Sequence, residues 1–343
     1  MATTTLVSVN TIDAQAKEET TKQSSFFQKL RNFVRADARN LFERGYYSNF
    51  ALRSGYPTSL DTSGLIITRH VSYVASDPQN ENLQLDIIRP AGFEGKLLPV
   101  FIFVHGGAWR SADKSDFLKV HENLCIRLAK KGVVCINVNH RLAPQYQFPT
   151  AEQDVAAAVA WTYRHVAQYG GNPNQLFVSG HSSGGHITAL VASDHSYLAA
   201  HGLPKQMIQG VISISGVMDV NHFYHHSYFM RNFSVKPYFG KDPIQYPDAS
   251  PINFMSATTP PTFLAHAEQH DEGLDKQAQR AEQLLRKEGV HVQRKSYCNT
   301  DHFLILSKVN ESSFLLTDDI TRFISEVVAM NSNALEQGAT GDA

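Results

Sequence analysis

Three residues in this chain have the types and the order required for nucleophilic catalysis. Ser182 lies in the run Gly-His-Ser-Ser-Gly at 180–184, which has the form G-x-S-x-G and follows a predicted strand. A serine hydroxyl attacks a carbonyl efficiently only when a base removes its proton and a carboxylate orients that base. Asp271 and His302 follow, each after a later predicted strand. We therefore expect Ser182 as nucleophile, His302 as base and Asp271 as acid.

The acid is the member of this set for which the sequence leaves alternatives open. Glu268 and Glu272 flank Asp271, and all three carboxylates follow the same predicted strand. The chain contains 16 histidines, so most of them must be structural or exposed. Position after the last predicted strand, and not residue type, is what selects His302.

A second motif supplies groups that stabilise negative charge. The run His-Gly-Gly-Ala-Trp at 105–109 directly follows an apolar strand. A tetrahedral intermediate requires hydrogen-bond donors where its oxygen becomes negative, and backbone N–H groups in a glycine-rich turn are accessible for this purpose. We assign this role to the N–H groups of Gly107, Ala108 and Ser183.

The substrate pocket is predicted from neighbouring residues. His105 and Trp109 are candidates for its walls, and core packing is the alternative for Trp109. The aromatic, histidine-rich segment 217–250 interrupts the alternation of strands and helices after a strand end. Such a segment is typical of a lid or pocket wall, and a simply packed insertion is the equally weighted alternative.

Apolar runs and helical patterns alternate along the chain. We predict strands at 66–75, 83–89, 99–104, 133–138, 176–179, 208–214, 261–266 and 290–297, and helices at 115–131, 150–169, 183–201, 274–288 and 314–330. Strands joined by long helical crossovers predict an α/β fold with a mostly parallel, doubly wound sheet of about eight strands and helices on both faces. Ligand sites in such sheets lie beyond the carboxyl ends of the strands, where both motifs are expected.

The domain organisation follows from changes in composition. Residues 1–25 are predicted to be a disordered tail, 26–60 an amphipathic helical cap segment, 61–331 the catalytic domain, and 332–343 a flexible tail. Basic residues interrupt the apolar positions of the second segment. The alternative to a cap is therefore peripheral contact of residues 26–44 with a membrane surface.

Composition excludes several classes of protein. The net charge of −1 lacks the basic excess of a dedicated nucleic-acid binder. Three cysteines cannot form a disulfide framework and are typical of a reduced compartment. Without a recognisable signal peptide or membrane span, we expect a cytoplasmic protein. The chain contains no P-loop or dinucleotide fingerprint, and His222, His225 and His226 lack the partners of a metal site. We therefore expect no cofactor and no metal.

Taken together, these motifs resemble the α/β-hydrolase superfamily, in its branch of carboxylesterases and lipases with an HGG oxyanion loop. Further matches to that branch are Arg-Leu-Ala-Pro at 141–144, Phe-Pro at 148–149, Ser-Pro-Ile at 250–252 and Pro-Pro at 260–261. A nearer resemblance is to the kynurenine formamidases (arylformamidases), on His-Gly-Gly-Ala-Trp at 105–109, Asp-Lys-Ser at 113–115 and Asp-His-Phe at 301–303. The segment before the acid is one residue longer than the usual Gly-x-x-Asp, and the Arg-Leu-Ala-Pro run favours general esterases.

The resemblance implies a serine hydrolase that cleaves a small carboxylic ester through an acyl-enzyme intermediate. The alternative within the class is a formamidase that hydrolyses N-formylkynurenine. A non-catalytic ligand-binding module of the same fold is the alternative from another class, and such modules typically lack one triad residue. The sequence leaves the acyl length, the leaving group and the oligomeric state open.

Overall fold

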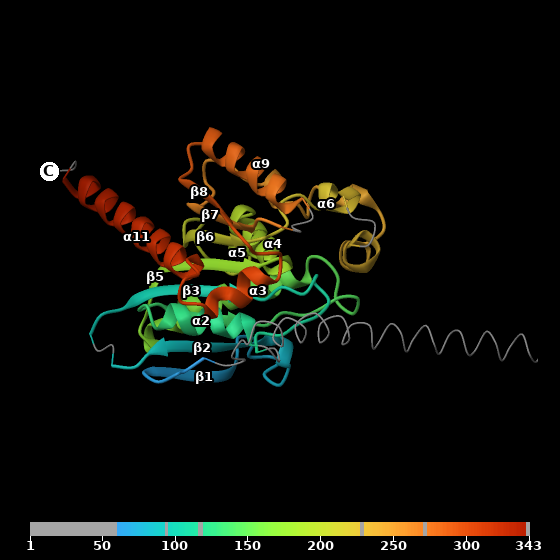
Figure 1. Cartoon of the computed structure of the whole chain (residues 1–343). Helices are drawn as coiled ribbons and strands as arrows, with labels where there is room; N and C mark the ends of the chain where they lie inside the picture. Colours follow the sequence, from blue (N-terminus) through green and yellow to red (C-terminus); the bar gives the residue numbers. More distant parts are fainter. Residues whose placement is uncertain (1–59, 93–94, 116–118, 227–229, 270–272, 341–343) are drawn as a thin grey trace, which may run out of the picture. The chain divides into compact units, whose positions relative to one another are not determined.

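The computed structural model describes residues 60–92, 95–115, 119–226, 230–269 and 273–340 (Figure 1). The chain divides into two compact units, Met1–Tyr56 and Pro57–Ala343, and all described residues belong to the second unit. The predicted tail at 1–25 and nearly all of the cap segment at 26–60 therefore lie outside the described residues. The same holds for two candidate acids, Asp271 and Glu272.

One sheet of eight strands organises the described chain. The strands are β1 (Leu65–Ser72), β2 (Gln84–Pro90), β3 (Leu98–Val104), β4 (Val134–Val138), β5 (Gly171–His181), β6 (Ile208–Ile214), β7 (Thr262–Ala267) and β8 (Val292–Tyr297). Their spatial order is β1-β2-β4-β3-β5-β6-β7-β8, which Figure 1 shows from bottom to top. β2 pairs antiparallel with β1 and β4, and every other pair is parallel. The predicted mostly parallel sheet is confirmed.

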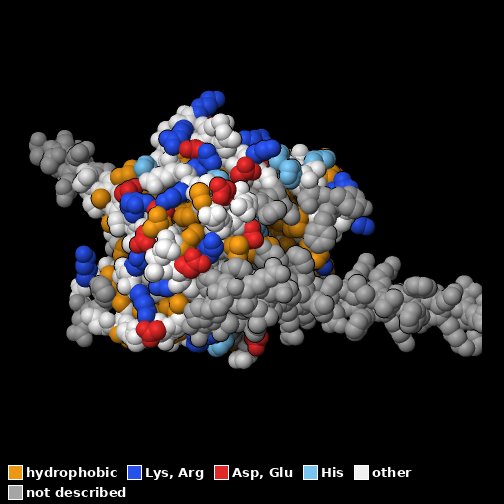
Figure 2. All heavy atoms as spheres, viewed as in Figure 1, with side chains coloured by type: hydrophobic (Ala, Val, Ile, Leu, Met, Phe, Trp, Pro, Cys, Tyr) orange, Lys and Arg blue, Asp and Glu red, His pale blue; other side chains and the backbone are white. Residues whose placement is uncertain are grey.

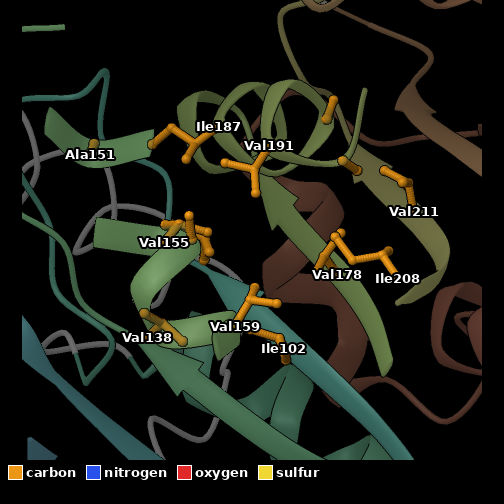
Figure 3. Packing of buried hydrophobic residues seen from close by; sticks show 14 of the residues in the cluster. Ile102, Val138, Ala151, Val155, Val159, Val178, Ile187, Val191, Ile208 and Val211 are labelled. Atoms are coloured by element: carbon orange, nitrogen blue, oxygen red, sulfur yellow. The ribbon is translucent and has the colours of Figure 1, made fainter. Parts of the chain in front are cut away.

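Helices cover both faces of this sheet. They are α2 (Val120–Ala129), α3 (Thr150–His165), α4 (Ser183–Ser193), α5 (Ser196–Ala199), α6 (Val220–His226), α8 (Lys236–Phe239), α9 (Leu274–Lys287), α10 (Leu304–Ser307) and α11 (Leu316–Thr340). Successive side chains of a strand point to opposite faces. Ile102 of β3 packs in a cluster with Val155 of α3 and Ile187 of α4 (Figure 3), whereas the ring of its neighbour Phe103 lies 6.0 Å from that of His121 in α2. Strands covered on both sides are mostly apolar, which explains the apolar run of β3.

Two helices begin or break where a local backbone feature intervenes. The predicted helix at 115–131 begins only at Val120, because Lys119 before it has a left-handed backbone with φ of 55°. The predicted helix at 183–201 is divided after Ser193. Asp194 is extended, with φ of −90° and ψ of 97°, and its carboxylate accepts the N–H of Ser196 at 3.0 Å. This contact closes the turn that leads into the short helix α5.

The last helix extends further than predicted. We expected a helix to 330 and a flexible tail at 332–343, but α11 continues to Thr340. Residues 331–337 contain no proline or glycine and include alanine, leucine, glutamate and glutamine. Alanine, leucine, glutamate and glutamine favour continuation of a helix.

The surface carries charges of both signs. On the face shown in Figure 2, lysine and arginine side chains lie among aspartates and glutamates, and histidines gather over α6. This mixture agrees with the net charge of −1. Within the described ranges, no helix combines the length and the apolar character that crossing a bilayer requires.

Candidate active site

The carboxyl ends of three parallel strands bring the sequence motifs to one edge of the sheet. β3 ends at Val104 before the glycine-rich turn, β5 ends at His181 before the candidate nucleophile, and β8 ends at Tyr297 before the loop with the candidate base. β3 and β5 are direct neighbours, paired from Val100 to Val104. The two motifs therefore lie side by side, as expected for a ligand site in this class of sheet.

Ser182 occupies a strained turn between β5 and α4. Its backbone has φ of 55° and ψ of −119°, which residues with a side chain rarely adopt. The glycines on either side allow this turn. A Cβ on Gly180 would lie 2.3 Å from the backbone carbon of Gly184, and a Cβ on Gly184 would lie 2.2 Å from the carbonyl oxygen of Val104. The turn thus requires glycine at both positions, and it holds the serine hydroxyl clear of the sheet.

The side chains of Ser182 and His302 are in contact. The Oγ of Ser182 lies 2.9 Å from the Nε2 of His302, within hydrogen-bond distance. His302 follows β8 in a tight turn, in which the carboxylate of Asp301 accepts the N–H groups of Phe303 and Leu304 at 2.9 and 2.8 Å. These bonds close the turn before α10, and the ring of His302 lies 4.8 Å from that of His181 at the end of β5.

His181 joins the two loops of this contact. Its Nε2 lies 2.7 Å from the carbonyl oxygen of His302, so this nitrogen carries the proton and donates. The two imidazole rings are 4.8 Å apart. Burial, with a smaller contribution from His302, lowers the pKa of His181 well below its ordinary value and keeps the ring neutral. Sequence reasoning assigned His181 no role and missed this contact, for which its position beside Ser182 was the available signal.

The turn that follows β3 leaves backbone donors available. Gly107, Ala108 and Trp109 all have positive φ, at 114°, 56° and 59°. A Cβ on Gly107 would lie 2.1 Å from the carbonyl oxygen of Ser111, so this position requires glycine. Hydrogen bonds between described residues leave the N–H groups of Gly107, Ala108 and Ser183 without an acceptor. These are the three donors that the sequence selected, and an anionic oxygen would satisfy them.

The two residues predicted to line the pocket are both buried in protein. His105 is 1% exposed and stacks on His140 with the rings 4.5 Å apart. Trp109 is also 1% exposed and donates its indole N–H to the Nδ1 of His186 at 3.2 Å. Neither side chain presents a surface to solvent, and the contacts of Trp109 are those of the core-packing alternative.

The segment at 217–250 packs onto the turn with Trp109. Tyr238 and Phe239 of α8 are buried, and their ring centroids lie 5.8 and 4.9 Å from that of Trp109. Phe223 of α6 is buried as well. The described part of this segment therefore packs its aromatic rings against the glycine-rich turn, and its role as a lid or pocket wall stays a prediction.

The acid of the proposed triad stays a prediction. Asp271 and Glu272 are outside the described residues. Glu268 is exposed, and its carboxylate accepts the N–H of Asn299 at 3.0 Å, so it caps the turn after β8. Among the described residues, no group of three or more histidine, cysteine or acidic side chains has a geometry suited to a metal ion.

Comparison with known proteins places this chain in a family. Residues 85–285, more than half of the chain, match the family model BD-FAE. The chain belongs to the BD-FAE family. This match includes the glycine-rich turn, the serine elbow and the insertion, and it ends before the loop with His302.

Curated relatives and a solved structure agree with this assignment. The esterase LipC of Mycobacterium tuberculosis is 32% identical over 193 residues, covering 53% of this chain and 47% of LipC. The chain thus spans about half the length of this relative. The kynurenine formamidase of Danio rerio is 25% identical over 253 residues, covering 72% of this chain and 79% of that protein. Esterase B from Lactobacillus rhamnosis has the same α/β-hydrolase fold, with a TM-score of 0.70 at 18% identity over 88% of this chain and 98% of its own.

Proposed function

We propose that this chain is a carboxylic ester hydrolase that acts on small esters through Ser182, His302 and Asp271. The observation that carries the proposal is the 2.9 Å contact between the Oγ of Ser182 and the Nε2 of His302. It occurs on a strained elbow beside three backbone N–H groups that lack an acceptor among the described residues. Membership of the BD-FAE family and the likeness to LipC support the same reaction class.

In the proposed mechanism, the Oγ of Ser182 attacks the ester carbonyl carbon while the Nε2 of His302 takes the hydroxyl proton. The carbonyl oxygen becomes negative and accepts hydrogen bonds from the N–H groups of Gly107, Ala108 and Ser183. Collapse of this intermediate breaks the bond to the alkoxy oxygen, which receives the proton from His302 and leaves as an alcohol. An ester of Ser182 remains.

Water completes the cycle. His302 removes a proton from a water molecule as the water oxygen attacks the acyl-enzyme, and the same three N–H groups stabilise the second intermediate. His302 then returns the proton to the Oγ of Ser182, and the carboxylic acid departs. Asp271, our candidate acid, orients the imidazole and stabilises its charged form.

The experiment that tests this proposal compares the full chain with its Ser182→Ala variant. We expect a fluorophosphonate probe to label the full chain at Ser182 and p-nitrophenyl butyrate to be hydrolysed. The variant should lose labelling and at least about a thousandfold in kcat, because the triad acts as a unit. Hydrolysis by the variant at the full rate would refute the mechanism. Absence of both labelling and hydrolysis in the full chain would instead support a non-catalytic binding module.

Kynurenine formamidase is the second candidate. The similarity to the Danio rerio protein covers 72% of this chain, more than the match to LipC does. Both reactions use the same acyl transfer, and a formyl group differs from longer acyl groups mainly in size. Comparing kcat/KM for N-formylkynurenine with that for p-nitrophenyl acetate, butyrate and octanoate separates the two. A strong preference for the formamide would replace the general esterase assignment.

A further inference from the structure

Behind the glycine-rich turn lies a buried polar network that the proposed mechanism does not use. Trp109 donates its indole N–H to the Nδ1 of His186 at 3.2 Å. The Nε2 of the same imidazole donates to the carbonyl oxygen of Ala249 at 2.7 Å. Since the Nδ1 accepts, His186 must be neutral for both bonds to exist. Burial lowers the pKa of His186 to about 4 and maintains that neutral form.

The aromatic insertion holds Trp109 from the other side. The ring of Tyr238 stacks parallel to the indole at 5.8 Å and 8°, and the ring of Phe239 meets it edge-on at 4.9 Å. The hydroxyl of Tyr238 donates to the Oε2 of Glu152 at 2.6 Å and accepts the N–H of Ala151 at 3.2 Å. Tyr238 of α8 therefore contacts both the start of α3 and Trp109 in the turn after β3.

Glu152 is the unusual member of this network. Its side chain is fully buried, and its Oε1 has no hydrogen-bond partner among the described residues. That oxygen lies 3.6 Å from the Nδ1 of His186. Burial raises the pKa of Glu152 to about 7, although the hydrogen bond from Tyr238 opposes the shift. A buried acid without an ion-pair partner is costly to keep, so its presence beside the site requires an explanation.

The turn itself needs external support. Ala108 and Trp109 are consecutive residues with side chains and positive φ, which is unfavourable for each of them. Their conformation directs the N–H groups of the turn, and it persists only where surrounding contacts fix it. Trp109 provides those contacts, through its indole N–H, its stacked ring and its carbonyl oxygen, which accepts the N–H of Ala143 at 2.8 Å.

We propose that Trp109 and Glu152 are positioning residues for the oxyanion site. Trp109, fixed by His186 and Tyr238, holds the N–H groups of Gly107 and Ala108 in the direction that stabilises the tetrahedral intermediate. Glu152 supports this arrangement in its neutral form and weakens it when ionised. The proposal rests on the hydrolase function proposed above.

The sign of the Glu152 effect follows from charge. An ionised carboxylate behind the turn repels the negative oxygen that the turn stabilises, and a low local dielectric strengthens that repulsion. The groups that face Glu152 do not neutralise it. His186 of α4 is neutral, while Tyr238 of α8 and Tyr197 of α5 have pKa values raised by burial and by Glu152. Asp154 of α3 is already paired with Arg141 at 2.6 Å.

The first test removes the indole N–H and keeps an aromatic ring. We expect Trp109→Phe to lower kcat for p-nitrophenyl butyrate by about 10- to 100-fold and to leave KM within about twofold, because the donors act on the transition state and not on bound ester. The matched control is Trp161→Phe, at the second of the two tryptophans, which stacks on His165 in α3 away from the turn. Both variants must retain the unfolding temperature within a few degrees, and Trp109→Phe with an unchanged kcat overturns the proposal.

The second test follows the proton on Glu152. In the Trp161→Phe background, Trp109 is the sole tryptophan, and its fluorescence should titrate with a midpoint near pH 7 that Glu152→Gln abolishes. Between pH 6 and 8.5, the ratio of kcat for Glu152→Gln to kcat for the wild type should rise by about threefold or more. This ratio removes the contribution of His302, which both proteins retain. A constant ratio, or an emission titration that survives Glu152→Gln, overturns the role of Glu152.

Labelling of Ser182 by the fluorophosphonate probe separates the two proposals. If the wild type is labelled and hydrolyses the ester, but Trp109→Phe keeps its kcat, the positioning role alone is wrong. If the wild type is neither labelled nor active, the hydrolase function is wrong, and the positioning role falls with it.

Discussion

The Nε2 of His181 lies 2.7 Å from the carbonyl oxygen of His302. His181 directly precedes Ser182, and the ring of His302 contacts the hydroxyl of Ser182. β6 and β7 lie between β5 and β8 in the sheet. This hydrogen bond therefore bridges two loops that no direct strand pairing connects. It links the position of the His302 imidazole to β5, the strand that leads into Ser182.

Removing this bridge should lower catalysis more than stability. In His181→Phe the ring is retained and the donor is lost, which leaves the His302 carbonyl without that bond and costs about 1–3 kcal/mol of unfolding free energy. We expect kcat to fall by about tenfold or more, because a displaced base loses its alignment with Ser182. Urea unfolding and ester turnover measure the two effects. His181→Gln, which retains an N–H donor, should recover part of kcat, and equal losses in both variants would contradict the positioning effect.

The choice among the three carboxylates leads to a second prediction. Asp271→Asn should lower kcat by about 10⁴, because the imidazole then loses the partner that orients it and stabilises its charge. Glu268→Gln and Glu272→Gln should each stay within about threefold of the wild type. Glu268 caps the turn after β8 through Asn299, and a glutamine oxygen accepts the same hydrogen bond. Full activity in Asp271→Asn would assign the acid to one of the glutamates.

The close approach at Gly184 predicts the effect of replacing this elbow glycine. A Cβ in Gly184→Ala would lie 2.2 Å from the Val104 carbonyl oxygen, so β3 or α4 must move. We expect a loss of about 1–3 kcal/mol in unfolding free energy and a large loss of kcat, since the moving parts carry the turn and the nucleophile. Gly170→Ala is the control. It has φ of 80° and open space around it before β5, so it should lose stability and keep kcat.

Buried histidines predict how stability depends on pH. Burial lowers the pKa values of His105, His181 and His186 below their ordinary value of 6.5. Below pH 6.5 the unfolded chain therefore binds protons that the folded chain does not, and the free energy of unfolding falls as pH falls, by about 1.4 kcal/mol per pH unit for each histidine. Urea unfolding at pH 7.5, 6.5 and 5.5 measures this slope.

Glu152 contributes with the opposite sign. Its raised pKa of about 7 means that the folded chain binds one more proton than the unfolded chain between about pH 4.5 and 7, so its contribution decreases as pH rises through that window. As pH falls, proton uptake by Glu152 stabilises the folded chain and so opposes the effect of the buried histidines. Glu152→Gln removes this stabilisation, and the free energy of unfolding of the variant should fall more steeply on acidification than that of the wild type. Equal slopes would show that the folded chain already ionises Glu152 at low pH.

The sequence predicted what depends on local pattern. The apolar runs predicted the central strands well, because strands covered on both faces are mostly apolar. Strand ends then brought Ser182 and His302 together without knowledge of the loops between them. Helix starts were less accurate, since the left-handed Lys119 before α2 has no sequence signature.

Contacts between distant segments could not be predicted in the same way. His186 is 77 residues from Trp109, and Glu152 is 86 residues from Tyr238. No periodicity relates these positions, and a buried carboxyl in a helix appears in the sequence as one more charged residue. Their roles depend on which neighbours remove them from water, and that information exists only in the folded chain.

The strained backbone of Ser182 affects which substitutions would stabilise this protein. Ser182 has φ of 55° and ψ of −119°, a backbone conformation that costs a residue with a side chain about 1–3 kcal/mol. Replacing Ser182 by glycine would relieve this strain. Selection for thermal stability alone would therefore favour Ser182→Gly, a variant that lacks the proposed nucleophile. The proposed catalytic role of the Ser182 hydroxyl, and not stability, therefore accounts for a residue with a side chain at this bend.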